Sequence, residues 1–135
     1  MRPTGFYSAI VESYLPMVRR GPAPEIGDGR ARTNPIADDD LAAACLEAIE
    51  SADPALALDC GGPDVISRHE LADLAFAAAG LPPRFRRVPP WVARAGAATL
   101  RLLHPRIGQF AKFIATISTR DLIAPPRGKL RLADA

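Results

Sequence analysis

The sequence predicts a single α/β domain. Segments with apolar residues three and four positions apart alternate along the chain with short apolar runs, and glycines and prolines stand at the joints. The chain has 135 residues, of which 48% are hydrophobic and 24% charged, a balance that predicts one buried core rather than disorder. The formal net charge of +2 is too small to indicate nucleic acid as a partner.

The first element is a joint between a strand and a helix. Pro3 fixes φ and lacks a donor, Thr4 is able to cap a helix, and Gly5 relaxes the steric limits on the turn. A helix follows, with its apolar residues at helical spacing: Phe6, Ile10, Val11 and Tyr14. We expect Pro16 to end or kink this helix.

Residues 21–40 read as a loop with a strand at its end. Asp28-Gly29 predicts a hairpin-like turn, and a short extended piece ends near Ile36. Three aspartates at 38–40 precede the next helix, where we expect them to act as caps. That helix, 41–52, has one predicted buried face: Leu41, Ala44, Cys45, Ala48 and Ile49.

The middle of the chain predicts a strand followed by a capped helix. Residues 55–60 form an apolar run that Gly61-Gly62-Pro63 ends. Ser67 and Glu70 make a capping box, and Gly80 is placed to end the helix. The expected apolar stripe consists of Leu71, Leu74, Ala75 and Ala78.

The last third predicts a strand and two helices. Residues 85–89 read as the strand, Pro90 starts a helix that runs through Leu103, and a second helix follows Pro105. The apolar face expected on the second helix consists of Ile107, Phe110, Ile114 and Ile117. We expect the domain to span 1–119 and residues 120–135 to form a turn-rich tail.

Metal, disulfide and membrane chemistry are not indicated. Cys45 and Cys60 have no CxxC spacing, and His69 and His104 lie far from them in sequence, so we expect no metal site and a reducing cytoplasm. The start of the chain has no apolar signal region, and no apolar run reaches the length of a membrane helix.

Four ordered stretches carry a resemblance to a known family: RPTGF, GDGRARTNPIADDDLA, LDCGGPDVISRHELADLAFAAAGLP and RVPPW. Together they span nearly the whole chain. In this order they resemble the C-terminal half of an atypical, extended short-chain dehydrogenase/reductase, of the NmrA-like or complex-I-accessory-subunit-like kind.

The resemblance implies a partial Rossmann-type fold, made of the substrate-binding half with few short strands and about five helices. It also implies NAD or NADP as cofactor, with Pro3, Thr4 and Gly5 near the nicotinamide. It places four further residues in a substrate pocket: Phe6, Tyr7, Asn34 and Trp91. The implied function is the substrate-binding half of an NAD(P)-dependent oxidoreductase or epimerase-like protein.

Two catalytic signatures of that superfamily are absent from this sequence. It contains no Gly-rich strand-to-helix turn of the kind that cradles a pyrophosphate. Tyr7 and Tyr14 are followed four residues on by Val11 and Val18, where a lysine would lower the pKa of a catalytic phenol. We therefore predict no catalytic residue in this chain and expect it not to bind the cofactor alone.

Two alternatives remain open at this point. The alternative to the substrate-binding half is a non-catalytic interaction module that pairs with a missing N-terminal half or forms a homodimer through exposed strand edges. Arg84, Arg86 and Arg87, beside Phe85 and Trp91, could bind a phosphate or a nucleic-acid strand, but a solvent-facing strand produces the same pattern. We expect a small-molecule substrate, no nucleic acid and no membrane partner.

Overall fold

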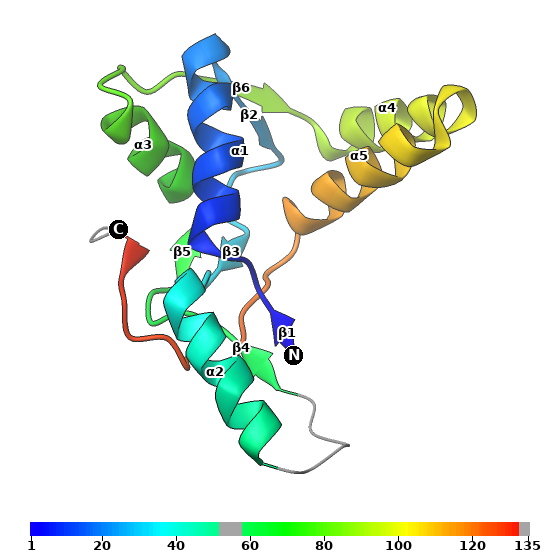
Figure 1. Cartoon of the computed structure of the whole chain (residues 1–135). Coiled ribbons are helices and arrows are strands. Elements are labelled where there is room, and N and C mark those ends of the chain that lie inside the picture. The colour runs from blue at the N-terminus through cyan, green and yellow to red at the C-terminus, as the bar shows by residue number, and fades with distance from the viewer. Residues whose placement is uncertain (52–57, 133–135) are drawn as a thin grey trace.

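The structure, a computed structural model, describes residues 1–51 and 58–132 (Figure 1). Within these ranges it has the expected α/β architecture, with five helices and six short strands. In chain order the elements are β1 (Arg2–Pro3), α1 (Tyr7–Arg20), β2 (Ala23–Ile26), β3 (Arg32–Thr33), α2 (Asp38–Glu50), β4 (Asp59–Cys60), β5 (Ile66–Ser67), α3 (Arg68–Ala78), β6 (Phe85–Val88), α4 (Pro90–Leu103) and α5 (Pro105–Ile117).

The strands pair two by two. β1 pairs with β4 and β2 with β6, both in parallel, and β3 pairs with β5 antiparallel. The hairpin predicted at Asp28-Gly29 is wrong, because β2 and β3 on either side of this turn pair with strands from distant parts of the chain. The turn itself is present, with Gly29 at φ +69°.

The joint at the start of the chain is confirmed. The N–H of Arg2 donates to the Leu58 carbonyl at 2.8 Å and the N–H of Thr4 to the Cys60 carbonyl at 3.2 Å. Pro3 lies between these two donors, at a position where the ladder needs none. Thr4 does not cap α1, because its hydroxyl donates instead to the Asn34 carbonyl at 2.6 Å.

Helix α1 continues through Pro16 to Arg20, so the expected end at Pro16 is wrong. A proline inside a helix removes one i→i−4 hydrogen bond. Packing holds the last turn in place, since Val18 is 2% exposed and lies in the cluster between α1 and α3. The buried members of this cluster are Val18, Ala23, Ala72, Ala75 and Phe76.

Helix α3 is capped as predicted. The Ser67 hydroxyl accepts from the Glu70 N–H, and the Glu70 carboxylate accepts from the Ser67 N–H at 2.7 Å. The backbone and side-chain hydrogen bonds from Ser67 lower the pKa of Glu70. The expected stripe is partly wrong: Leu74 and Ala78 are exposed, because α1 covers the face that carries Ala72 and Phe76.

Helix α2 covers a second, smaller cluster formed by Ile36, Ala44 and Cys60. Ile49, predicted on the buried face, is 76% exposed. Asp38 lies inside the first turn and does not cap its own helix; its carboxylate accepts from the Ser8 hydroxyl at 2.7 Å and from the Ser8 N–H at 3.0 Å. These two bonds lower the pKa of Asp38.

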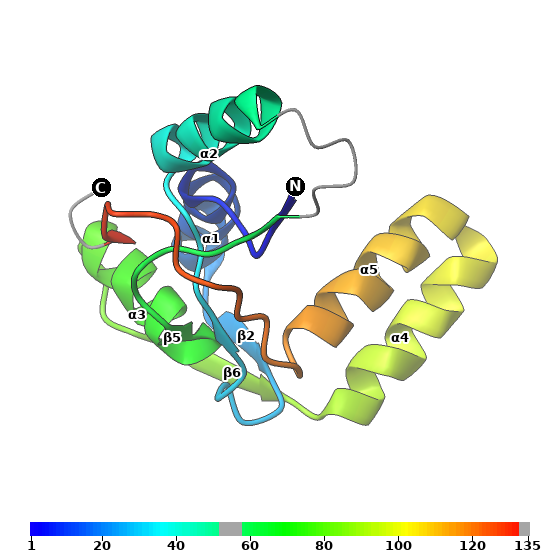
Figure 2. The same ribbon diagram turned by 90° about the horizontal axis from the view of Figure 1, so that it is seen from below.

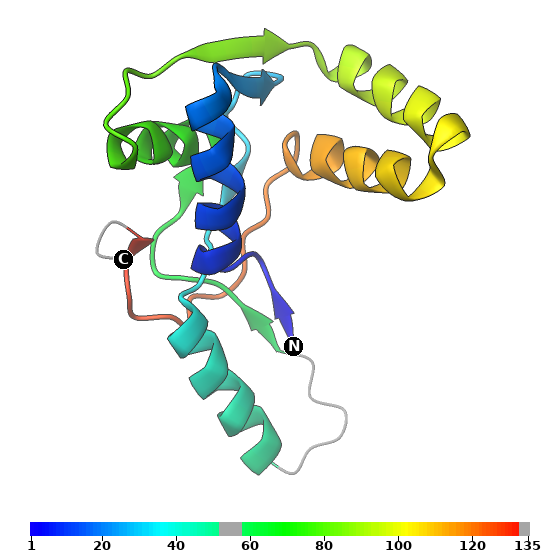
Figure 3. The same cartoon turned by 45° about the horizontal axis from the view of Figure 1, so that its top comes forward.

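Helices α4 and α5 form an antiparallel hairpin that projects away from the rest of the chain (Figures 2 and 3). The two helices approach each other closely at Gly108, where a Cβ atom would lie 2.3 Å from the Arg101 Cα. The residues of α5 that α4 buries are Gly108 and Ala115, not the predicted apolar face. Ile107 and Phe110 of that face are 54% and 64% exposed.

The segment after α5 returns along the body of the molecule (Figure 1). Asp121 accepts from the backbone and guanidinium of Arg32, and the Leu122 N–H donates to the Arg32 carbonyl at 2.7 Å. The Asp40 carboxylate then accepts from the backbone N–H groups of Lys129 and Leu130. In the described ranges no helix is long and apolar enough to cross a membrane.

Candidate functional site

An apolar cleft of about 480 Å³ lies between α1 and the inner face of α5. Its walls come from elements far apart in sequence, because β6 carries the chain away from α3 and leads into the α4–α5 hairpin (Figure 3). The α1 wall includes Phe6, Ala9, Ile10, Ser13, Tyr14 and Met17, and the α5 wall includes Phe110, Phe113, Ile114 and Ile117. A volume of this size suits a small organic molecule.

Helical periodicity positions both walls. Phe6, Ile10 and Tyr14 are four residues apart and therefore share one side of α1. On α5 the close contact at Gly108 turns the opposite side of the helix toward the cleft, so Phe110 and Phe113 remain 64% and 56% exposed. Three residues of the apolar face that the sequence predicted for α5, Phe110, Ile114 and Ile117, thus line the cleft instead of a core, and Ile107 does not.

Two polar side chains without partners lie along the cleft. Thr33, which is 1% exposed, has a buried hydroxyl oxygen that makes no hydrogen bond in the described part of the chain. The Nε atom of Arg68 is likewise buried and unpaired there. A buried polar atom without a partner costs free energy, so a hydrogen-bond partner for either atom would stabilise the folded chain.

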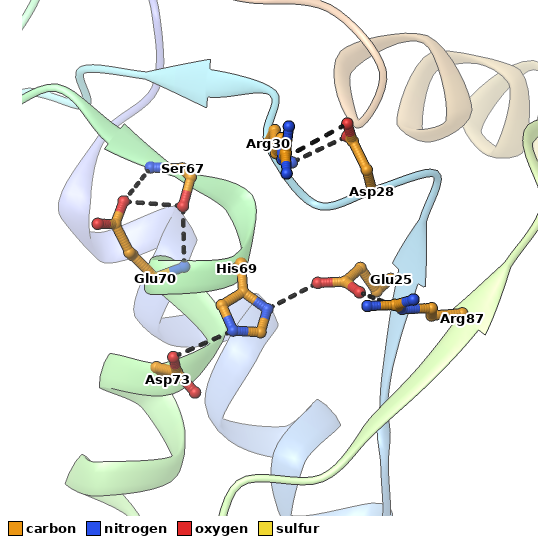
Figure 4. A network of polar contacts seen from close by, with 8 residues as sticks. All are labelled: Glu25, Asp28, Arg30, Ser67, His69, Glu70, Asp73 and Arg87. Atoms are coloured by element: carbon orange, nitrogen blue, oxygen red, sulfur yellow. Dashed lines mark hydrogen bonds and ion pairs between the residues drawn. The ribbon is translucent and has the colours of Figure 1, made fainter.

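A network of charged side chains, drawn in Figure 4, includes two residues of the cleft lining, Glu25 and His69. Oε1 of Glu25 lies 2.7 Å from Nδ1 of His69, and Oε2 lies 3.6 Å from Nε of Arg87. The His69 ring stacks on Phe85 with centroids 4.3 Å apart. Its second nitrogen lies 3.4 Å from the Asp73 carboxylate, so the ring links Glu25 of β2 to Asp73 of α3.

Gly29 makes room for this network. A Cβ at Gly29 would lie 2.3 Å from Oε1 of Glu25, and φ there is in the left-handed region that disfavours other residues. The Gly29 carbonyl also accepts from the His69 N–H at 3.1 Å. Glycine at this position therefore lets the buried Glu25 carboxylate meet the histidine.

The cleft contains three of the seven residues that the sequence singled out: Thr4, Gly5 and Phe6. Pro3 lies in β1, next to the cleft but not in its lining. Trp91, at the start of α4, is 70% exposed and does not line it either. The structure therefore brings the expected cofactor turn and Phe6 together and leaves Trp91 apart.

Tyr7 and Asn34 lie inside the body of the molecule. The Tyr7 hydroxyl donates to the Leu130 carbonyl at 2.7 Å, and Tyr7 is 5% exposed. The Asn34 amide donates to the Gly62 and Ala124 carbonyls and accepts from the Ala124 N–H at 3.0 Å. In this structure Asn34 joins three chain segments and does not face the cleft.

Sequence reasoning missed the polar part of the site. Thr33 and Arg68 were named only within longer motifs, and Glu25 and His69 are 44 residues apart, a separation that no local pattern bridges. The apolar face of α5 was recognised, but periodicity could not distinguish a cleft wall from a core. Over residues 1–51 and 58–132 no cluster of His, Cys, Asp and Glu is arranged to hold a metal ion.

Comparison with protein-family models and with curated proteins finds no match. Among solved structures, the UDP-glucuronic acid 4-epimerase from Bacillus cereus in complex with NAD matches with a TM-score of 0.49 and 18% identity, covering 61% of this chain and 28% of that one. The UDP-glucose 4-epimerase from Thermus thermophilus in complex with NAD matches with a TM-score of 0.42 and 20% identity, covering 62% and 27%. This chain thus spans less than a third of the length of either structure, and its α/β class rests on its own helices and strands.

Proposed function

We propose that this chain is the substrate-binding part of an NAD(P)-dependent oxidoreductase or epimerase-like protein, and that it holds a small, largely apolar molecule between α1 and α5. One observation carries the proposal. Thr4 and Gly5, the turn that the family resemblance places near a nicotinamide, line the same cleft as Phe6 and the apolar side of α5. A cofactor ring at this turn would face a molecule bound in the cleft.

The lining narrows the substrate class. Aliphatic and aromatic side chains form both long walls of the cleft, and apolar walls favour a ligand whose body is itself apolar. A polyhydroxylated sugar would leave many hydroxyl groups without partners against these walls. Of the two reactions that the resemblance implies, oxidation or reduction of a small organic substrate therefore fits better than epimerisation of a sugar.

The chain's own role in the proposed reaction is to bind and position. The apolar walls would exclude water from the substrate, and the backbone at Thr4 and Gly5 would contact the nicotinamide end of the cofactor. A polypeptide segment with a Gly-rich turn would supply the pyrophosphate site, since none is encoded in these 135 residues. The cofactor supplies the hydride chemistry when bound.

The test uses the neutral fluorescent probe N-phenyl-1-naphthylamine, which brightens in apolar sites. We expect saturable binding to the purified chain, and Ala9→Phe, which fills the cleft from α1, should weaken binding by about fivefold or more. Ala42→Phe adds the same ring to an exposed position of α2 outside the cleft and serves as the matched control. No saturable binding, or equal losses in both variants, would overturn the proposed site.

A second measurement addresses the cofactor. If most of the dinucleotide site lies outside this chain, millimolar NADH or NADPH should leave the thermal midpoint unchanged. A ligand at a hundred times its dissociation constant stabilises the folded state by about 2.7 kcal/mol, an effect that raises the midpoint by several degrees. A shift of that size would mean that the chain binds the cofactor by itself.

A second candidate function is a self-associating interaction module, which the outer surface of the α4–α5 hairpin favours. Trp91, Leu102 and Leu103 are 70%, 87% and 70% exposed there, and exposed apolar side chains gather at interfaces. This reading predicts a dimer in light scattering that Leu102→Glu with Leu103→Glu converts to a monomer. A monomer at all concentrations for the unmodified chain would exclude it.

A further inference from the structure

We propose that the ligand of the cleft is an amphipathic organic anion, whose apolar body lies between α1 and α5 and whose single carboxylate, sulfonate or phosphate group binds Arg68 and Thr33. This inference rests on the proposed function of the cleft as a ligand site. It goes further by naming the chemical class of the ligand and the two side chains that select it.

Arg68 is the charged group of the cleft that has no partner of its own. In the described ranges the charged or titratable residues of the lining are Glu25, Arg68 and His69, together with the Tyr14 phenol. Glu25 and His69 engage each other at 2.7 Å, and Arg87 lies 3.6 Å from the second oxygen of Glu25. Arg68 forms no ion pair there, and its Nε is buried without a hydrogen bond.

The backbone around Arg68 is held in place by hydrogen bonds. Its N–H donates to the Ala31 carbonyl at 2.9 Å, and the preceding residue, Ser67, is the N-cap of α3. The antiparallel pairing of β3 with β5 places Arg32 opposite Ser67 and Thr33 opposite Ile66. Arg68 therefore lies across from Ala31, two positions along the strand pair from Thr33 and diagonal to it. Both then line one cleft.

The buried hydroxyl of Thr33 is a second, independent observation that supports the anion site. It is 1% exposed, lines the cleft, and has a hydroxyl oxygen with no partner in the described part of the chain. A hydroxyl that donates to an anion, beside a guanidinium that donates to the same anion, satisfies both groups at once. Neutral ligands would leave the buried Nε of Arg68 with a weaker acceptor.

The experiment compares two dyes with the same aromatic body. The anion 8-anilinonaphthalene-1-sulfonate carries the charged group that N-phenyl-1-naphthylamine lacks. In Arg68→Met we expect the affinity for the sulfonate dye to fall about tenfold while the affinity for the neutral dye stays unchanged. Arg86→Met, at an exposed position of β6 outside the cleft, should change neither.

Two further variants keep the test decisive if Arg68→Met does not fold. Arg68→Lys retains the positive charge and should keep most of the affinity for the sulfonate dye. Thr33→Val keeps the shape of the side chain, and its affinity should fall about threefold for the sulfonate dye alone. Circular dichroism melting confirms the fold of each. Equal losses for both dyes in Thr33→Val would count against the inference.

The outcomes separate this inference from the proposed function. If the neutral dye binds in the cleft but removal of Arg68 leaves the sulfonate affinity unchanged, the anion site is overturned and the apolar cleft stands. If neither dye binds, both fail. A loss confined to the sulfonate dye in Arg68→Met or Thr33→Val supports the anion site.

Discussion

Asn34→Ala should destabilise the chain more than its loss of a few atoms suggests. The Asn34 amide makes three hydrogen bonds, to the Gly62 carbonyl at 3.2 Å and to the Ala124 carbonyl and N–H at 2.7 and 3.0 Å. Asn34 is 1% exposed, so its backbone partners would be left unsatisfied away from water. At about 1 kcal/mol for each bond, the free energy of unfolding should fall by about 3 kcal/mol.

The assay is thermal unfolding followed by circular dichroism. A loss of about 3 kcal/mol should lower the midpoint by about 10 °C in a domain of this size. Limited trypsin digestion reports on the same contact, because release of the Ala124 segment frees the Arg127 backbone, whose N–H donates to the Gly61 carbonyl at 2.9 Å in the folded chain. If this segment opens locally, cleavage at Arg127 should accelerate by about a hundredfold.

The control is Asp121→Ala, which removes an anchor of the same segment. Oδ2 of Asp121 lies 2.8 Å from Nη2 of Arg32, but both side chains are largely exposed, so this change should lower the thermal midpoint far less than Asn34→Ala does. A midpoint for Asn34→Ala within about 2 °C of the unmodified chain, with unchanged cleavage at Arg127, would refute the role assigned to Asn34.

Three further changes test the fold around the cleft. Ser67→Ala removes the cap of α3 and should cost about 1 kcal/mol, measured as a lower urea midpoint. Gly108→Ala places a Cβ 2.3 Å from the Arg101 Cα and should loosen α4 from α5, which hydrogen exchange across 90–117 will detect as faster exchange. Asp38→Asn weakens the acceptor for Ser8. Because the pKa of Asp38 in the folded chain is lowered from 3.8, the ionised carboxylate stabilises the fold above that value, and this stabilisation is lost as the pH falls below it. The urea midpoints of the variant and the unmodified chain should therefore differ at pH 7 and converge near pH 2.

Each of these predictions has a clear contrary result. An unchanged urea midpoint in Ser67→Ala would mean that the capping hydrogen bonds contribute nothing net. Unaltered exchange in Gly108→Ala would mean that the two helices are not in close contact at that point. A difference between Asp38→Asn and the unmodified chain that persists at the lowest pH would show that the effect is not one of charge.

The sequence by itself determined the elements whose signals are local. The capping box of Ser67 and Glu70, the Gly80 terminus and the prolines that start α4 and α5 fixed those helices, because caps and φ restraints act within a few residues. The turn at Pro3 was readable for the same reason. The expected end of α1 at Pro16 was wrong, because packing of Val18 outweighed the local cost of the proline.

The tertiary structure alone decided which faces became cleft and which became core. Periodicity marked one apolar face on α5, but the contact of Gly108 with α4 turned that face toward α1. The pairing of β3 with β5 placed Thr33 and Arg68, which are 35 residues apart in the sequence, diagonally across one strand pair and in the lining of one cleft. The sequence gives neither residue a functional signal. Burial and the lack of a partner are properties of packing between distant segments, so the groups we assign to the ligand could be identified only in the folded chain.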